Sequence, residues 1–312
     1  MKVISGKHGR FLGNGDEHMR KQLKADLALL SVVIFWGSTF VLTKDAIQHI
    51  QTYNFLSLRF GIAAVLLALL SYKKLHTLDR LTAKNGIILG LMLFTAYAFQ
   101  TVGLNYTTAS NSAFIVGFSA VIVPVISAAY LKKKPQPSAV LGVLLAVTGL
   151  GLLTLGDSFV LNIGDIYTFF CTFFFALQII MIDRYTRLSD PMLLATVEIG
   201  TVAAASILFS FILEQPMIPV RSDIWLALAV TSLLATTYAF LVQNIAQKYT
   251  SPTHTALIFI GEPVFALAFA FIILGEMLTF RQFIGCSLIL TGMFAAEFDP
   301  LHKTKRSKSL LR

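Results

Sequence analysis

The sequence predicts an all-α membrane protein with ten transmembrane helices, arranged as two inverted five-helix repeats around a central cavity. Three observations lead to this fold class. The 312 residues are 56% hydrophobic and only 13% charged, whereas soluble domains carry about a quarter charged residues. The apolar residues form runs suited to a bilayer core, which needs roughly 20 residues per helix. A sequence segment that begins at Asn105 also recurs in similar form later in the chain.

Ten apolar stretches, separated by polar turn signals, define the expected helices in chain order. Runs such as "FGIAAVLLALL" and "FALAFAFIILG" are typical of these stretches. Some connections are very short, for example Asn105 to Thr108, so neighbouring helices must run antiparallel. The expected spans are 27–45, 54–72, 85–104, 109–131, 138–156, 163–183, 191–213, 223–247, 253–274 and 281–298.

The positions of Lys and Arg predict the orientation of the chain. With the N-terminus inside, 21 of the 25 cationic residues fall in inner loops and tails, and positive charge is typical of cytoplasmic loops. Lys44, Arg59, Arg221 and Arg281 are assigned to positions on or near the outer side. Both ends of the chain are therefore expected in the cytoplasm, and the net charge of +9 indicates cytoplasmic loops rather than nucleic-acid binding.

The recurring sequence segment indicates an internal repeat. "NYTTASNSAFIVGFSA" from Asn105 aligns with "KYTSPTHTALIFIGEP" from Lys248 at a constant offset of 143 residues. Eleven of the 51 pairs over residues 100–150 are identical. Each half holds an odd number of spans, so the second half must enter the bilayer upside down. Such inverted repeats are typical of secondary transporters, with the substrate site between the halves near the midplane.

The repeat also sets the expected domain organisation. We expect a flexible basic cytoplasmic tail, a first five-helix repeat, a second inverted five-helix repeat and a basic cytoplasmic tail, at residues 1–22, 23–156, 157–299 and 300–312. Met19 is a natural start for a membrane protein, which leaves open whether residues 1–18 belong to the native chain. Cys171 and Cys286 lie inside apolar runs, so they are expected to be buried and not to form a disulfide.

Six pieces of the sequence resemble the drug/metabolite transporter superfamily, specifically its EamA-type ten-helix members. They are "WGSTFVLTK" (36–44), "LRFGIAA" (58–64), "TTASNSAFI" (107–115), "VIVPVISA" (121–128), "GEPVFALAFAFIILGE" (261–276) and "QFIGCSLILTG" (282–292). The resemblance covers about residues 23–298. It implies a bacterial carrier of small metabolites such as amino acids, often an exporter. The first half departs from the pattern in two ways. It lacks the glycine-glutamate pair at 132–133, and its Pro124 lies one helical turn after position 120, which is the repeat equivalent of Pro263.

Glu262 is the candidate proton-coupling residue. It lies about nine residues into a span that starts at the cytoplasmic face, which places it near the bilayer centre at ~1.5 Å per residue. Ionisable groups inside a membrane usually face a cavity or a partner. Pro263 leaves the carbonyl of Phe259 without its helical donor. Glu262 could bind and release a proton, or it could hydrogen-bond a neighbouring helix around this kink.

Eight polar or aromatic residues within the spans are expected to bind substrate: Trp36, Tyr97, Gln100, Asn111, Phe114, Gln178, Tyr238 and His254. Tyr97 and Gln100 are three residues apart and share a helix face, although such side chains also tie helices together. His254 starts the span that contains Glu262 and lies about 80° from it around the helix.

Other charged residues have structural interpretations. Lys44 and Arg184 end their helices and are expected to extend to the membrane interface, with a gating ion pair as the alternative. Glu276 and Arg281 are expected to form a solvated pair at an outer turn. Glu198 is a second buried carboxylate with no obvious partner.

The leading prediction is secondary transport of small metabolites by alternating access across the bacterial cytoplasmic (inner) membrane, in the export direction, with proton coupling considered at Glu262. No GxxxxGK[ST] motif occurs, so ATP binding by that route is not expected. The alternatives are a channel and an intramembrane enzyme acting on lipid, although an enzyme would need clustered His, Asp and Glu. No catalytic residue, cofactor or metal is expected. The expected partners are substrate, lipid bilayer and protons, with a homodimer left open and no nucleic acid.

Overall fold

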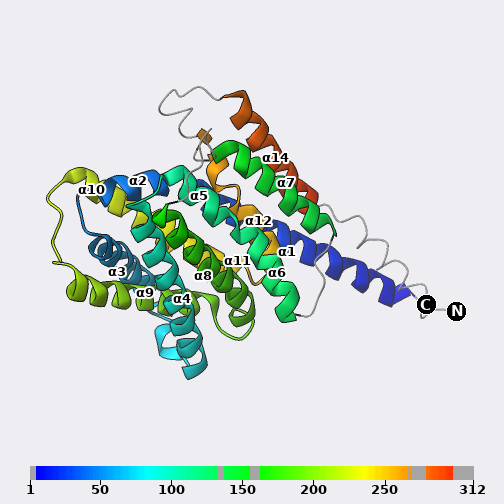
Figure 1. Cartoon of the computed structure of the whole chain (residues 1–312). Helices are drawn as coiled ribbons and strands as arrows, with labels where there is room; N and C mark the ends of the chain where they lie inside the picture. Colours follow the sequence, from blue (N-terminus) through cyan, green and yellow to red (C-terminus); the bar gives the residue numbers. More distant parts are fainter. Residues whose placement is uncertain (1–4, 132–136, 155–161, 266, 269–278, 298–312) are drawn as a thin grey trace.

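The structure is a computed structural model that describes residues 5–131, 137–154, 162–265, 267–268 and 279–297. The described residues form helices and connecting loops, with no β-strand among them (Figure 1). The predicted all-α class is confirmed. Among the residues that the structure describes, seven stretches are long and apolar enough to cross a membrane: Met19–Ala46, Thr52–Ser71, Arg80–Leu104, Asn111–Ala129, Ile163–Tyr185, Pro191–Leu213 and Ser222–Ala246.

The helices follow one another with short connections. In chain order they are α1 (Ser5–Gly37), α2 (Thr39–Ala46), α3 (Thr52–Ser71), η1 (Leu75–Thr77), α4 (Arg80–Leu104), α5 (Ala109–Gly117), α6 (Ser119–Leu131), α7 (Pro137–Thr154), α8 (Ile163–Tyr185), α9 (Pro191–Leu213), α10 (Ser222–Ala229), the π-helix η2 (Val230–Tyr238), α11 (Ala239–Ala246), α12 (Pro252–Phe259) and α14 (Phe280–Glu297). Helical residues lie within every predicted span. However, the apolar helices within α7 and α14 are shorter than a typical span, and the ninth predicted span runs beyond the described residues. The number of ten membrane crossings therefore stays a prediction.

Side-chain caps explain where five helices begin. Asp79, Thr108, Asn162, Asp190 and Ser251 each accept a hydrogen bond from a backbone N–H in the first turn of the helix that follows. Such caps satisfy N–H groups that have no partner inside the helix. The cap of α4 lies six residues before the predicted start of that span, so α4 begins earlier than its apolar run.

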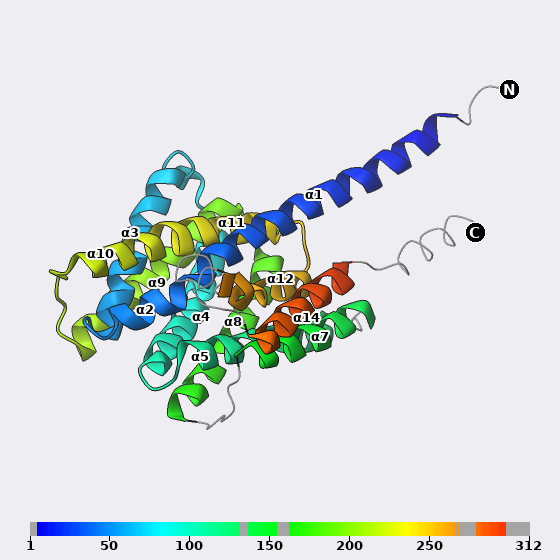
Figure 2. The ribbon, with the colours of Figure 1, turned by 90° about the horizontal axis from the view of Figure 1, so that it is seen from above.

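The N-terminal segment differs from the expected flexible tail. α1 begins at Ser5, so most of the segment predicted as irregular is continuous with the first apolar helix. No proline interrupts residues 5–37, and proline is the residue that most strongly breaks a helix interior. Figure 2 shows this N-terminal part of α1 projecting beyond the other helices.

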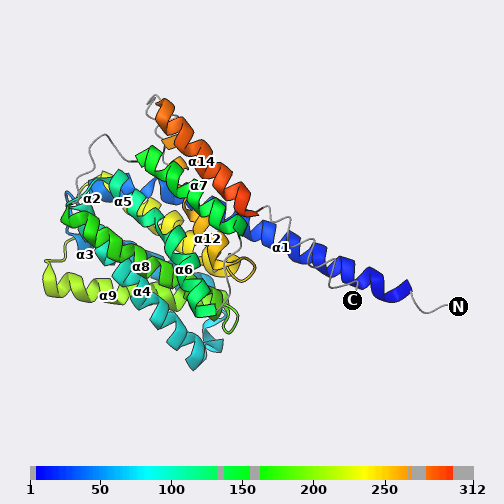
Figure 3. The same cartoon turned by 45° about the vertical axis from the view of Figure 1, so that its right-hand side comes forward.

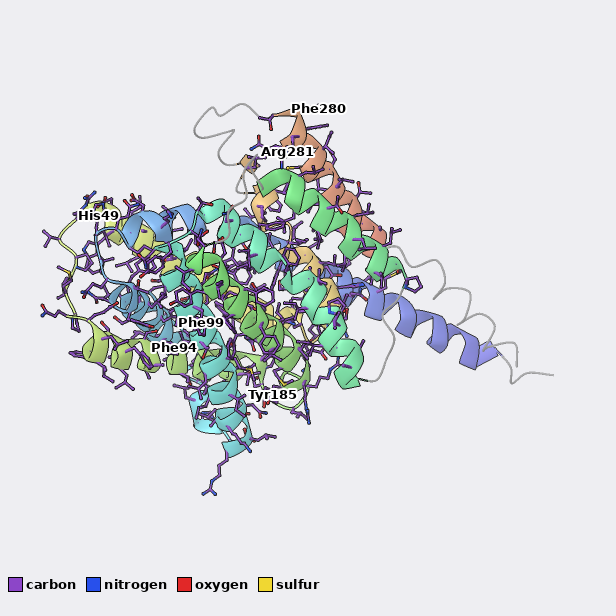
Figure 4. The ribbon with its side chains drawn as sticks, in the orientation of Figure 1. His49, Phe94, Phe99, Tyr185, Phe280 and Arg281 are labelled. Atoms are coloured by element: carbon purple, nitrogen blue, oxygen red, sulfur yellow. The ribbon has the colours of Figure 1, made fainter. Side chains whose placement is uncertain are left out.

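The ends of the helices are consistent with an alternating path through a membrane. Figure 4 places His49 and Arg281 toward one end of the bundle and Tyr185 toward the other. His49 and Arg281 belong to predicted outer connections, and Tyr185 belongs to a predicted inner one. The face of the membrane on which each end lies stays a prediction.

α7 and α14 pack against each other through glycines that are equivalent in the sequence repeat. The two helices lie side by side in Figures 1, 2 and 3. A Cβ atom added to Gly149 would lie 2.5 Å from the carbonyl oxygen of Gly285, and one added to Gly292 would lie 2.5 Å from that of Gly142. At the offset of 143 residues Gly149 corresponds to Gly292 and Gly142 corresponds to Gly285. The two contacts are therefore equivalent, and the packing of α7 against α14 is nearly symmetric. Close approach of backbones at small residues is typical of membrane helix packing.

This contact predicts that Gly149→Ala and Gly292→Ala destabilise the protein, because each methyl group must push the partner backbone away. Overpacking of this kind costs typically about 1–3 kcal/mol. The measurement is the thermal unfolding midpoint of the purified protein in detergent. Gly61→Ala and Gly200→Ala are matched controls, since no atom lies within 4 Å of a Cβ at either site. Equal midpoints for all four variants would contradict the proposed packing.

Candidate functional site

A cavity lies between helices of both predicted repeats. Its lining comes from the ends of helices that meet in the interior and from the middle of longer ones. The lining residues are Trp36, Thr39, Thr43, Arg59, Tyr97, Gln100, Thr101, Leu104, Ala113, Val116, Gly117, Ser119, Phe175, Gln178, Ile179, Phe240, Gln243, Phe259, Ile260, Glu262 and Pro263. A polar site between the two halves is where the sequence places the substrate.

Three helices are interrupted where they reach this cavity. α1 gives way to α2 after Gly37, α5 gives way to α6 after Gly117, and α12 ends shortly before the helical turn that contains Glu262. At the first interruption the backbone N–H and Oγ of Ser38 both donate to the carbonyl oxygen of Phe35, at 3.3 and 2.9 Å. Freed backbone groups thus keep partners, as a membrane interior requires. Discontinuous helices of this kind form the substrate sites of many transporters.

Arg59 provides a positive charge in the cavity wall. It lies on α3, and only 3% of its surface is exposed. Its Nε donates to Thr236 Oγ1 at 2.9 Å, and its Nη2 lies 3.4 Å from the hydroxyl of Tyr97. The guanidinium carbon also lies 4.8 Å from the ring centroid of Tyr97 and 5.2 Å from that of Phe60. Arg59, which the sequence places on or near the outer side, is therefore buried among the helices, and its side of the membrane stays a prediction.

Glu262 provides the ionisable acid of the same cavity. It lies directly before Pro263, at the start of the helical turn after α12, and both residues line the cavity. Arg59 lines the same cavity. Their side chains nevertheless form no ion pair within 4.0 Å among the described residues. The cavity thus holds two groups of opposite charge that remain apart.

Aromatic rings form the remaining wall around these charges. The indole Nε1 of Trp36 donates to the carbonyl oxygen of Ala235 at 2.8 Å. Its ring lies 4.8 Å from that of Phe259, centroid to centroid. The ring of Tyr97 packs edge-on against Phe175 at 5.3 Å. Because these rings are fixed by their neighbours, the cavity wall is largely preformed.

A network of buried amides lies behind one side of the cavity. Gln178 Nε2 donates to one carboxyl oxygen of Glu198 at 2.8 Å, and Asn244 Nδ2 donates to the other at 2.9 Å. Gln243 Nε2 donates to Gln178 Oε1 at 3.2 Å and to Gln247 Oε1 at 3.0 Å. Sequence reasoning found no obvious partner for Glu198, and these two hydrogen bonds correct that interpretation. The network fixes Gln178 and Gln243, two of the three amide side chains in the cavity lining.

The predicted site residues divide into two groups. Trp36, Tyr97, Gln100, Gln178 and Glu262 come together around the cavity. Four others are absent from its lining and lie elsewhere on the same helices or their neighbours: Asn111, Phe114, Tyr238 and His254. The difference arises because the sequence identifies a helix as cavity-facing but does not identify which of its faces points inward.

Each of these four residues has a local environment of its own. The backbone N–H of Asn111 donates to the Thr108 cap in the first turn of α5. Phe114 packs edge-on against the ring of Phe118. The hydroxyl of Tyr238 lies 2.6 Å from Ser31 Oγ. His254 Nδ1 lies 3.3 Å from Gln22 Nε2, two turns of helix away from Glu262.

Lys44 has a different role from the one that its sequence position suggests. Its Nζ donates to the carbonyl oxygens of Leu104 at 3.1 Å and Thr107 at 2.5 Å. The hydroxyl of Thr107 in turn donates to Asp165 Oδ1 at the start of α8. Lys44 therefore ties α2 to the end of α4 and is not simply extended toward the interface. Glu276 lies outside the described residues, so its predicted pair with Arg281 stays a prediction.

Sequence reasoning missed Arg59, Thr39, Thr43 and Gln243 as cavity residues. The signal for Arg59 was its place inside an apolar run, where charge is costly. Gln243 carried a signal too, since it is the repeat equivalent of Gln100. Within the described part of the chain, no group of three His, Cys, Asp or Glu side chains could hold a metal ion.

Comparisons with known proteins agree with this architecture. The sequence pattern of the EamA-like transporter family matches the chain twice, over residues 23–155 and 162–296. An uncharacterized transporter of Archaeoglobus fulgidus is 37% identical over 88% of this chain and 85% of its own length. The uncharacterized transporter YyaM of Bacillus subtilis is 27% identical over 93% of this chain and 100% of its own length.

A solved crystal structure shares the fold. It matches with a TM-score of 0.75 at 18% sequence identity, over 88% of this chain and 96% of the matched chain. At this level of identity the similarity supports the fold alone. The two family matches together include most of the sequence and confirm the resemblance noted from its motifs. The chain belongs to the EamA-like transporter family.

Proposed function

We propose that the chain is a secondary transporter that exports small metabolites, amino acids or related compounds, with Glu262 as its proton-carrying group. The observation that carries this proposal is that Arg59 and Glu262 face one cavity without pairing directly. Ionisable groups in a membrane are costly and usually line a substrate or ion pathway. Two opposite charges that are held apart suit a polar or zwitterionic molecule between them.

The proposed architecture has ten spans, with the repeats at 23–156 and 157–299 and both termini in the cytoplasm of a bacterial inner membrane. The two family matches, which fall on successive halves of the chain, support the division. The nearly symmetric contact of Gly149 and Gly292 with the opposite helix supports a two-fold relation between the halves. Inverted halves of this kind move against each other around a fixed site in many transporters.

Closure of the cavity on two sides supports alternating access. On the side of α2, Lys44 connects that helix to the carbonyl oxygens of Leu104 and Thr107. On the side of α1 and α11, Leu29 and Ala246 belong to a buried cluster against which Phe259 packs. Release of one closure at a time would expose the cavity to each side of the membrane in turn.

Competition at Glu262 provides a route to proton coupling. The carboxylate can accept either a proton or the positively charged amino group of a substrate, and both cannot occupy it together. Binding of substrate from one side would then release a proton, and protonation from the other side would release substrate. An exchange of this kind uses the inward proton gradient to drive export.

Replacement of the carboxyl group tests this route. Glu262→Gln in proteoliposomes should abolish substrate movement driven by a pH gradient, because the amide cannot carry a proton. Exchange of labelled for unlabelled substrate should continue. Asp183→Asn is the control, since Asp183 belongs to an exposed pair with Arg187 at the end of α8, and coupling should persist in it. Unchanged coupling in Glu262→Gln would remove Glu262 as the proton site.

Two amide residues allow the location of the binding site to be tested. Gln100 lines the cavity, whereas Asn111 does not. A thermal-shift screen against amino acids, nucleosides, sugars and cationic drugs first identifies a ligand, since a ligand that binds the native state stabilises it. Gln100→Ala should then weaken binding about 2- to 10-fold, as expected for one lost neutral hydrogen bond. Asn111→Ala should leave the affinity unchanged, and an equal loss in both variants would place the site elsewhere.

A further inference from the structure

Arg59 keeps its charge in the membrane interior through neutral groups alone. The guanidinium is bound by the hydroxyls of Thr236 and Tyr97 and lies against two aromatic rings. Cation–π contacts of a desolvated guanidinium contribute about 2 kcal/mol or more. Among the described residues no carboxylate forms an ion pair with Arg59. A buried arginine that serves only to hold the fold would normally be paired, because unpaired buried charge is expensive.

The guanidinium also has unused hydrogen-bonding capacity toward the cavity. An arginine carries five N–H donors, and the two hydrogen bonds to Thr236 and Tyr97 are the ones formed within the described part of the chain. The planar fork of a guanidinium binds a carboxylate through two parallel hydrogen bonds. Arg59 lines the cavity, so its remaining donors are available to a molecule that enters.

We propose that Arg59 binds the negatively charged group of the transported molecule and that this group is a carboxylate. The inference rests on the proposed transport function and specifies which chemical class the cavity accepts. Arg59 is the single cationic side chain among the lining residues, and Glu262 lies in the same lining. A doubly charged phosphate ester would leave one negative charge unmatched beside Glu262, whereas a carboxylate matches the guanidinium one to one.

The neutral anchoring of Arg59 explains how it can serve in every step of transport. Its charge does not depend on Glu262, because Thr236 and the rings of Phe60 and Tyr97 hold it in place. Protonation of Glu262 therefore leaves the carboxylate-binding group intact. Arg59 selects the substrate by its negative end, while Glu262 exchanges a proton for its positive end.

Binding measurements on the purified full-length chain in detergent test this assignment without any ion gradient. The chain has two tryptophans, and Trp225→Phe leaves Trp36, in the cavity wall, as the only one. The fluorescence of Trp36 then reports binding. The probes are L-leucine, its deaminated acid 4-methylpentanoate, its decarboxylated amine 3-methylbutylamine and 3-methylbutyl phosphate, together with the corresponding L-phenylalanine set. Both acids and both amino acids should bind, and the amines and phosphates should bind at least about 10-fold more weakly, as expected for a lost charged hydrogen bond.

Substitutions at Arg59 locate the effect. Arg59→Gln should weaken binding of the carboxylates by about 10- to 100-fold, the range expected for hydrogen bonds to a charged group. Arg59→Lys keeps the charge but loses the fork, so the acids should bind with intermediate affinity even if Arg59→Gln proves poorly folded. Arg221→Gln removes an exposed cation that pairs with Asp223 and serves as the matched control, with unchanged affinity.

The outcomes distinguish this inference from the proposed coupling. Loss of carboxylate binding in Arg59→Gln, together with proton coupling that survives in Glu262→Gln, would support Arg59 and refute Glu262. Amines that bind the wild-type protein as tightly as amino acids would overturn the assignment of Arg59. Affinity for the acids within twofold of wild type in both Arg59 variants, or failure of every carboxylate probe to bind, would also overturn it.

Discussion

The structure depends on the cost of placing charge inside a membrane. Arg59 and Glu262 both lie in the interior of the helical bundle, where charged groups need solvent, partners or a cavity. The chain meets this requirement by surrounding Arg59 with hydroxyls and aromatic faces and by leaving open space beside both groups. A fully packed core would have to neutralise or expel these two side chains. Their presence in the interior is consistent with the cavity that they line, and the proposed function uses this cavity.

The helical framework is shaped around that cavity. Long uninterrupted helices such as α4, α8 and α9 give the bundle its rigid contacts, and close approaches at Gly90 and Gly103 hold them together. Interrupted helices supply part of the lining, because a break at Gly37 or Gly117 ends the regular backbone and exposes short polar residues, and continuous helices such as α4 and α8 supply the rest. Both halves of the chain contribute continuous and interrupted helices to the cavity. An arrangement of this kind permits one half to move against the other while the site between them is preserved.

Much of the fold could be predicted from composition and repetition, because lipid imposes long apolar helices whatever their partners. The helix breaks could not, since Gly37 and Gly117 resemble many other glycines in apolar runs. The rule that cations mark loops does not apply to Arg59, which lies within α3 and is bound by Thr236, a residue far away in sequence. Trp36, Gln100 and Glu262 could be identified because a polar or aromatic side chain inside an apolar span usually faces a cavity or a partner. Tyr238 and His254 met the same criterion but lie away from the cavity lining, which only the packing of helices decides.

The central claim, that one cavity between two inverted halves opens to each side in turn, is tested most directly by cysteine accessibility. Replacing Cys171 and Cys286 by Ala and introducing Gln100→Cys leaves one thiol in the cavity lining. The measurement is its reaction with a membrane-impermeant maleimide, in right-side-out and inside-out vesicles, with and without bound substrate. The account predicts labelling from both faces and protection by substrate. Labelling from a single face under every condition would contradict it.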